Sequence, residues 1–120
     1  MPTGLDHVLA AIALCQRLIQ GMSALQGVED APKQSLTLRL EKVHCDLVMM
    51  QDRFFLRSKL CLPFAARCEQ EARKLEGALG SLGASGGPES LHAFRGTLEA
   101  LERAVKVLDD RSAAQGMVIT

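Results

Sequence analysis

Cysteine and histidine are the residues of this chain best suited to bind a metal or to act as nucleophiles. Structural zinc sites bring their ligands in pairs roughly two to four residues apart. The adjacent His44 and Cys45 would instead point about 100° apart on a helix. We therefore expect reduced thiols in the core or at its boundary, with a metal site or an inter-helical disulfide as the alternatives. The chain has four cysteines, Cys15, Cys45, Cys61 and Cys68.

No pattern in the sequence predicts an enzyme. A catalytic cysteine needs surroundings that stabilise its thiolate and an oriented base, and no spacing indicates either. His7 and His92 lie near the starts of expected helices, which favours a solvated or capping role. The glycine-rich stretch 83–87 lacks the lysine and hydroxyl residue of a phosphate-binding loop. We therefore expect no catalytic residues, no cofactor and no small-molecule substrate.

The apolar residues that surround these candidates recur at helical spacing. Thr3 followed by Asp6 has the pattern of a helix start, and that helix should end near residue 25, with Gly27 as its stop. Pro32 suits the first turn of a second helix, because the N–H that proline lacks would have no partner there. Acidic residues just before it place negative charge at the positive end of the helix. Leucines at heptad spacing then predict that this helix continues to about Arg57.

Proline and glycine mark the rest of the chain. The residue before Pro63 is disfavoured in helical conformation, so a tight connection is expected there, followed by a third helix. The stretch 83–90 is rich in glycine and predicts a flexible loop. Pro88 then suits the start of a fourth helix, which should end near Arg111.

These segments predict an all-α fold, an antiparallel up-down-up-down four-helix bundle. The bundle would occupy residues 1–111 as one domain, and residues 112–120 would form a flexible tail. The composition agrees, because leucine, alanine and methionine favour helices and aromatic residues make up 3% of the chain.

Charge and hydropathy limit the expected partners and location. Fourteen basic and fourteen acidic residues give a formal net charge of zero, and no aromatic residues alternate with the basic ones, so we expect no nucleic-acid binding. The N-terminus carries no basic leader, and its apolar run 8–15 is too short to span a bilayer. We expect a cytoplasmic protein that is either fully in solution or peripheral at a membrane.

Two surfaces are candidates for binding. Basic and apolar residues alternate over residues 52–67, at the connection between the second and third helices, which we call the corner. This pattern suits an anionic membrane surface or an acidic partner. The alternative is that Phe55 and Leu60 pack under the corner and the charges are solvated. The first helix has an apolar stripe wide enough for self-association or a protein partner. The first surface comprises Arg53, Phe55, Arg57, Lys59, Leu60 and Arg67. The second comprises Val8, Ala11, Leu18 and Leu25.

Two stretches carry a resemblance to a known family. Glu29-Asp30-Ala31-Pro32-Lys33 opens a leucine-rich helix, and "ARCEQEARKLEGAL" places Cys68 and Glu69 ahead of spaced leucines. With the small-residue-rich first helix, this resembles the N-terminal helical domain of fungal STAND (NLR-like) proteins, over residues 4 to about 110. The resemblance implies a HeLo-like four-helix bundle.

The resemblance also implies a function. Such domains act as signalling or cell-death effectors, so we expect a non-enzymatic module that acts by self-association and, in one version, by membrane contact. The alternative is an adaptor or scaffold bundle that presents an apolar helix face to a protein partner. A cofactor- or metal-bound bundle is a third hypothesis.

Overall fold

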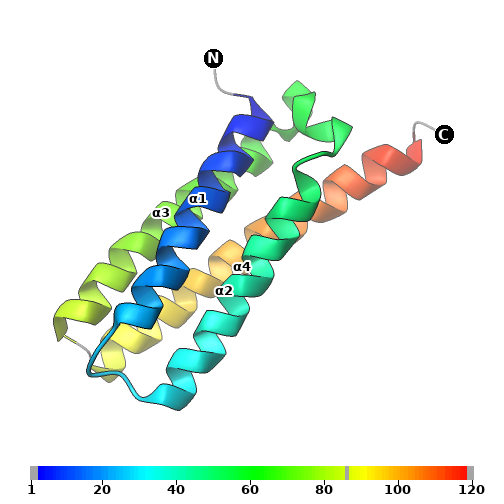
Figure 1. Ribbon diagram of the computed structural model, residues 1–120. Coiled ribbons are helices and arrows are strands. Elements are labelled where there is room, and N and C mark those ends of the chain that lie inside the picture. The colour runs from blue at the N-terminus through cyan, green and yellow to red at the C-terminus, as the bar shows by residue number, and fades with distance from the viewer. Residues whose placement is uncertain (1–2, 86, 119–120) are drawn as a thin grey trace.

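The computed structural model describes the backbone of residues 3–85 and 87–118 (Figure 1). Over this part of the chain the structure is helical and has no strand, so the predicted all-α helical bundle is confirmed. The elements are α1 (Gly4–Ala24), α2 (Asp30–Met50), the short 3₁₀ helices η1 (Phe54–Arg57) and η2 (Lys59–Cys61), α3 (Leu62–Ser85) and α4 (Pro88–Val118).

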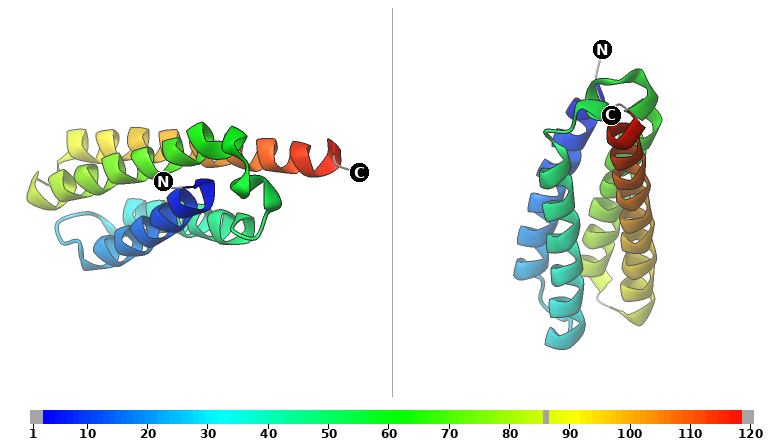
Figure 2. Two further views of the ribbon diagram at one scale, coloured as in Figure 1. Left: turned by 90° about the horizontal axis from the view of Figure 1, so that it is seen from above. Right: turned by 90° about the vertical axis from the view of Figure 1, so that its right-hand side faces the viewer.

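The helices pack side by side in two pairs. In Figure 1 the chain runs down along α1, back up along α2, down along α3 and up along α4. α1 packs against α3 and α2, whereas α4 packs closely against α3 and less extensively against α2. Figure 2 shows that the C-terminal end of α4 projects past the end of α2. No helix within the described residues is long and apolar enough to cross a membrane.

The expected start of the first helix is confirmed in detail. The Thr3 hydroxyl accepts a hydrogen bond from the Asp6 backbone N–H at 3.2 Å, and the Asp6 carboxylate accepts one from the Thr3 N–H at 2.8 Å. This reciprocal pair satisfies two of the backbone donors that a helix start leaves without partners. At the other end of α1, Lys33 Nζ donates to the Leu25 carbonyl at 2.9 Å, and Gly27 turns the chain with φ = 83°.

The core consists of the apolar stripes of all four helices. Each stripe keeps three- and four-residue spacing, which directs it to one face of its helix. Aliphatic residues dominate, and Phe94 on α4 is the largest fully buried side chain. Among the residues with no exposed surface are Leu18, Leu40, Leu75 and Leu98.

The second helix ends earlier than its heptad pattern predicts. α2 stops at Met50 instead of near Arg57, and the chain then forms η1 and η2. The corner closes because Leu56 is buried at 1% exposure, and because Arg53 adopts an extended conformation, φ −71° and ψ 133°. The residue before Pro63 was expected outside the helical region, but Leu62 has φ −50° and ψ −51° and begins α3.

The fourth helix is longer than expected, and the loop before it is shorter. α3 continues to Ser85 and α4 begins at Pro88, so most of the expected flexible loop 83–90 is helical. α4 then continues to Val118. The expected flexible tail 112–120 is thus helical up to that residue, in part because Ser112 is buried and bonded to the second connection. Residues 119–120 lie outside the described residues.

Candidate interaction surface

Three of the four cysteines are buried thiols. Cys15, Cys61 and Cys68 have no exposed surface, whereas Cys45 is exposed on α2. Burial raises the pKa of Cys15 and of Cys68 to about 12, and it also raises the pKa of Cys61. A thiol in such surroundings is a poor nucleophile, because the thiolate is the reactive form. All four are free thiols, as expected, although Cys45 lies at the surface and not in the core.

Two Glu-x-x-His motifs, which the sequence reasoning missed, do not form a metal centre. In di-iron bundles such motifs project from two helices into the core. Here Glu41, Glu89 and His92 are exposed. His44 is half-buried, and its Nε2 atom is buried with no hydrogen-bond partner. Among the described residues no three histidine, cysteine or acidic side chains lie close enough to share a metal ion.

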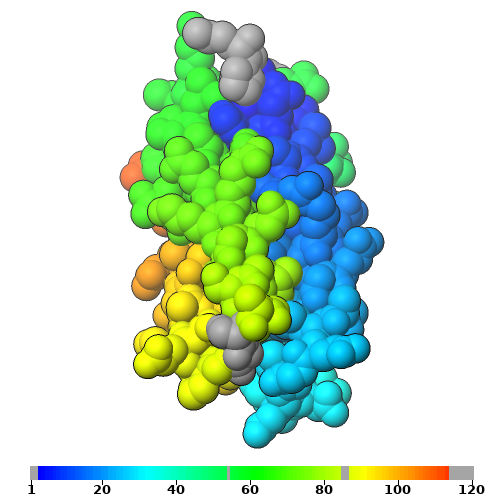
Figure 3. All heavy atoms as spheres, turned by 90° about the vertical axis from the view of Figure 1, so that its left-hand side faces the viewer, coloured from blue at the N-terminus to red at the C-terminus, as the bar shows by residue number. Residues whose placement is uncertain are grey.

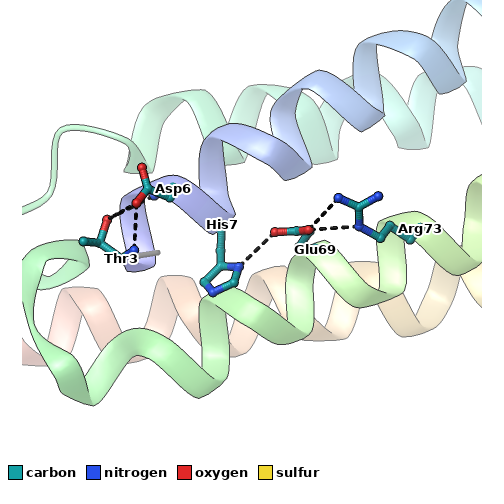
Figure 4. A network of polar contacts seen from close by, with 5 residues as sticks. All are labelled: Thr3, Asp6, His7, Glu69 and Arg73. Atoms are coloured by element: carbon teal, nitrogen blue, oxygen red, sulfur yellow. Dashed lines mark hydrogen bonds and ion pairs between the residues drawn. The ribbon is translucent and has the colours of Figure 1, made fainter. Parts of the chain in front are cut away.

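His7 joins the first helix to the third. Figure 4 shows it pointing from α1 towards Glu69 on α3, with Nδ1 2.9 Å from Oε1. Arg73 donates to the other carboxylate oxygen of Glu69 at 2.9 Å. The hydrogen bond from His7 lowers the pKa of Glu69, and Arg73 lowers it further. The expected solvated or capping role of His7 is therefore wrong, because it fastens two helices together. Glu69, part of the family-like stretch, likewise has a structural contact.

The predicted self-association face on α1 is not on the surface. Val8, Ala11 and Leu18 have no exposed area, and Leu25 is half-buried against the core. The stripe is broad because α1 contacts two helices, α2 on one side and α3 on the other. Val8, Ala11 and Leu18 are therefore unable to contact a second molecule while the bundle is folded.

The predicted basic corner is partly used inside the molecule. Phe55 is 8% exposed and belongs to the core. Arg53 Nη1 donates to the Asp109 carboxylate at 2.5 Å, to the Asp109 carbonyl at 3.2 Å and to the Ser112 hydroxyl at 2.5 Å. These contacts fasten the second connection to α4. Phe55 and Arg53 are thus structural residues and not part of a free surface.

The other predicted corner residues remain on the surface, and Arg67 is bonded to a neighbour on its own helix. Leu60 is 66% exposed, and Lys59 and Arg57 are exposed near it. Arg67, one turn into α3, is exposed and donates to Glu71 at 3.2 Å. The alternative in which Phe55 and Leu60 both pack under the corner is confirmed for Phe55 and wrong for Leu60, because most of the Leu60 side chain is accessible.

A groove between α3 and α4 is one of several hollows on the described part of the molecule, and Arg67 and Arg103 are its charged lining residues. It has a volume of about 460 Å³ and its floor is apolar. Val107 is 43% exposed within it. Figure 3 shows this side of the molecule, with the green start of α3 next to the orange part of α4. We call it the α3–α4 groove, and its lining residues are Pro63, Phe64, Arg67, Ala100, Arg103, Ala104 and Val107.

Arginine side chains surround the apolar floor of this groove. Arg67 and Arg103 line it, and the guanidinium carbon of Arg111 lies 5.2 Å from the centre of the Phe64 ring. That distance is within the range of a cation–π contact. Arg67 was among the predicted residues, but the sequence reasoning missed the rest. The helical spacing of positions 100, 104, 107 and 111 could have shown that they share one side of α4.

Some apolar side chains are exposed outside the groove. Leu38 and Met49 on α2 are 65% and 69% exposed, and Leu9 on α1 is 46% exposed. Leu38 and Met49 lie on the same outward face of α2 because three helical turns separate them. Single exposed apolar residues are common on protein surfaces.

Comparison of the chain with known protein families, with curated proteins and with solved structures finds no match.

Proposed function

We propose that the chain is a non-enzymatic protein-binding bundle whose α3–α4 groove holds a segment of a partner protein. The proposal rests on one observation, the apolar groove of about 460 Å³ that arginines flank. Exposed apolar surfaces rimmed by polar residues often mark protein-interaction sites, and an amphipathic helix can lay its apolar face into such a groove. This is the adaptor role expected as an alternative from the sequence, with the binding face on α3 and α4 instead of α1.

The signalling role that the family resemblance implies is compatible with this proposal. A signalling module also needs a surface for a partner. The α1 face that the sequence predicts for self-association is not accessible at Val8, Ala11 and Leu18, because these residues are buried. The α3–α4 groove supplies an accessible surface in its place.

A panel of helical peptides tests the proposal. Acidic, neutral and basic amphipathic peptides carrying a fluorophore would be titrated with the protein, and binding measured by fluorescence anisotropy. Ala100→Phe would fill the groove from its floor, whereas Ala13→Phe adds the same bulk to the exposed face of α1. We expect at least one peptide to bind, with affinity about tenfold lower for Ala100→Phe. No binding below about 1 mM, or equal loss with both variants, would refute the proposal.

Membrane contact at the corner is a second candidate, favoured by Leu60. Its side chain is 66% exposed next to the exposed Lys59, and basic residues beside an apolar one suit an anionic lipid surface. Co-sedimentation with vesicles of anionic lipid should fall when Lys59 and Leu60 are both replaced by serine. The control is Leu38→Ser, which removes an equally exposed leucine on α2. Absence of sedimentation at low salt would exclude this candidate.

A further inference from the structure

We infer that the partner segment of the α3–α4 groove is an acidic amphipathic helix of about three turns, whose apolar face meets the groove floor and whose carboxylates pair with Arg103 and Arg111. The inference rests on the proposed function and specifies its ligand. It follows from the length of the groove, the size of its floor residues and the distribution of charge along α4.

The floor of the groove suits a helix. Ala100 and Ala104 are small, so a third helix can approach the α3–α4 pair closely, and Phe64 and Val107 offer apolar contacts beside them. The α4 side of the groove rises about 10 Å from Ala100 to Val107, and Arg111 lies about one further turn along α4, so a partner helix of three turns would reach from Ala100 to Arg111. Helices satisfy their own backbone hydrogen bonds, so this surface offers no strand edge for an extended peptide to pair with.

The charge at the groove is positive. Its charged lining residues in the described part of the chain are Arg67 and Arg103, and no carboxylate lines it. Glu71, buried beneath, accepts hydrogen bonds from both Arg67 and Lys74 at 3.2 Å, so two cations share that single carboxylate. Arg103 is exposed, and Arg111 presents its guanidinium over the Phe64 ring.

Three acidic residues of α4 lie on its α2 side. Glu102 binds Arg39 on α2 through two hydrogen bonds of 3.1 and 2.5 Å, Asp109 binds Arg53, and Asp110 lines a hollow beside α2. Glu102 and Asp109 are thus held in internal ion pairs, and no carboxylate among the described residues lines the groove on the α3 side. Two copies of the protein placed groove to groove would repel one another, so the charge complement of this surface is an acidic partner.

Peptides that differ in charge alone test the inference. Three helical peptides of about 12 residues share one apolar face and carry glutamate, glutamine or lysine along its flanks. Anisotropy titrations at about 50 and 300 mM NaCl measure both affinity and its screening. The protein variant is Arg103→Glu with Arg111→Glu. The matched control is Arg95→Glu with Lys106→Glu, which makes the same charge change at exposed positions of the same helix.

We expect the glutamate peptide to bind at least tenfold more tightly than the lysine peptide, and more weakly at high salt. The Arg103/Arg111 variant should lose about tenfold in affinity, and the control less than about twofold. Circular dichroism checks that both variants remain folded.

Other outcomes separate the inference from the proposed function. If all three peptides bind equally and Ala100→Phe weakens them, the groove binds helices but the inferred preference for acidic ones is wrong. If no peptide binds, both are wrong. If anionic vesicles bind and the Arg103/Arg111 variant abolishes this while the peptides stay unbound, the ligand is a lipid surface and the inference is overturned.

Discussion

Replacing Gly4 by alanine should destabilise the protein by about 1–3 kcal/mol, the usual cost of added bulk in a packed core. Gly4 is the first residue of α1 and is buried. A methyl group there would overlap the sulfur of Cys61 and lie 2.7 Å from the Leu56 carbonyl oxygen. Because that oxygen belongs to the backbone of the corner, the strain spreads into η1 and η2. Only a shift of α1 or of the corner would relieve the close contact with the Leu56 carbonyl oxygen.

A double-mutant cycle isolates this contact. Cys61→Ala removes the sulfur, so the methyl group of Gly4→Ala can occupy part of the vacated space, and the double variant should be more stable than the sum of the single effects by about 1 kcal/mol. Urea denaturation followed by circular dichroism measures each free energy of unfolding. In thermal melts 1 kcal/mol corresponds to roughly 3–5 °C for a chain of this size.

A matched glycine gives the opposite sign. Gly77 lies within α3, where an added methyl group meets nothing within 4 Å. Gly77→Ala should stabilise the protein by up to about 1 kcal/mol, because alanine favours the helix. If Gly4→Ala also stabilises the protein, or if its effect and that of Cys61→Ala add independently, the close packing of α1 on the corner is refuted.

Three further predictions test other parts of the structure. In the folded protein the exposed Cys45 should react rapidly with a thiol reagent such as DTNB. The thiols of Cys15, Cys61 and Cys68 should react at the rate of unfolding, because burial protects them and raises their pKa. Rapid reaction of more than one thiol would contradict this. Arg53→Met should cost about 1–2 kcal/mol in urea denaturation, since it removes hydrogen bonds to a carboxylate at a partly exposed site. Arg95→Met, at an exposed site on α4, should change stability by less than about 0.5 kcal/mol. The folded protein holds the pKa of Glu69 below its usual 4.5, so the stability gained from its ionised form is present above about pH 4.5 and is lost as pH falls through the lower folded pKa. The stability difference between the wild type and Glu69→Gln should therefore shrink on acidification, and a difference that is constant with pH would contradict the contacts of Glu69 with His7 and Arg73.

Local signals predicted where the helices begin and where α1 ends, but not where α2, α3 and α4 end. Thr3 and Asp6 form the expected capping box because its hydrogen bonds lie within one turn. The end of α2 depends on contacts with distant parts of the chain. Arg53 reaches Asp109, and Leu56 lies beside Gly4, so the corner is set by α4 and α1. A heptad pattern in one segment carries no information about those neighbours.

The candidate binding surface was harder to predict than the fold. A wide apolar stripe on α1 fits either two neighbours inside the bundle or one neighbour and an external partner, and the sequence alone does not distinguish them. Val8 and Leu18 proved to be core residues. The sequence does not reveal the groove because its α4 side consists of alanine, arginine and valine at positions 100, 103, 104 and 107, which do not stand out as an apolar stripe.

The pairing of α1 with α3 also matters during protein synthesis. α1 packs more extensively against α3 than against its sequence neighbour α2. A ribosome that adds roughly 5–20 residues per second needs about 3–12 s to pass from the end of α1 to the end of α3. During that interval the apolar side of α1 is without its main partner. A nascent chain that stalls after α2 therefore presents this surface to chaperones, whereas one that has passed Ser85 can bury it.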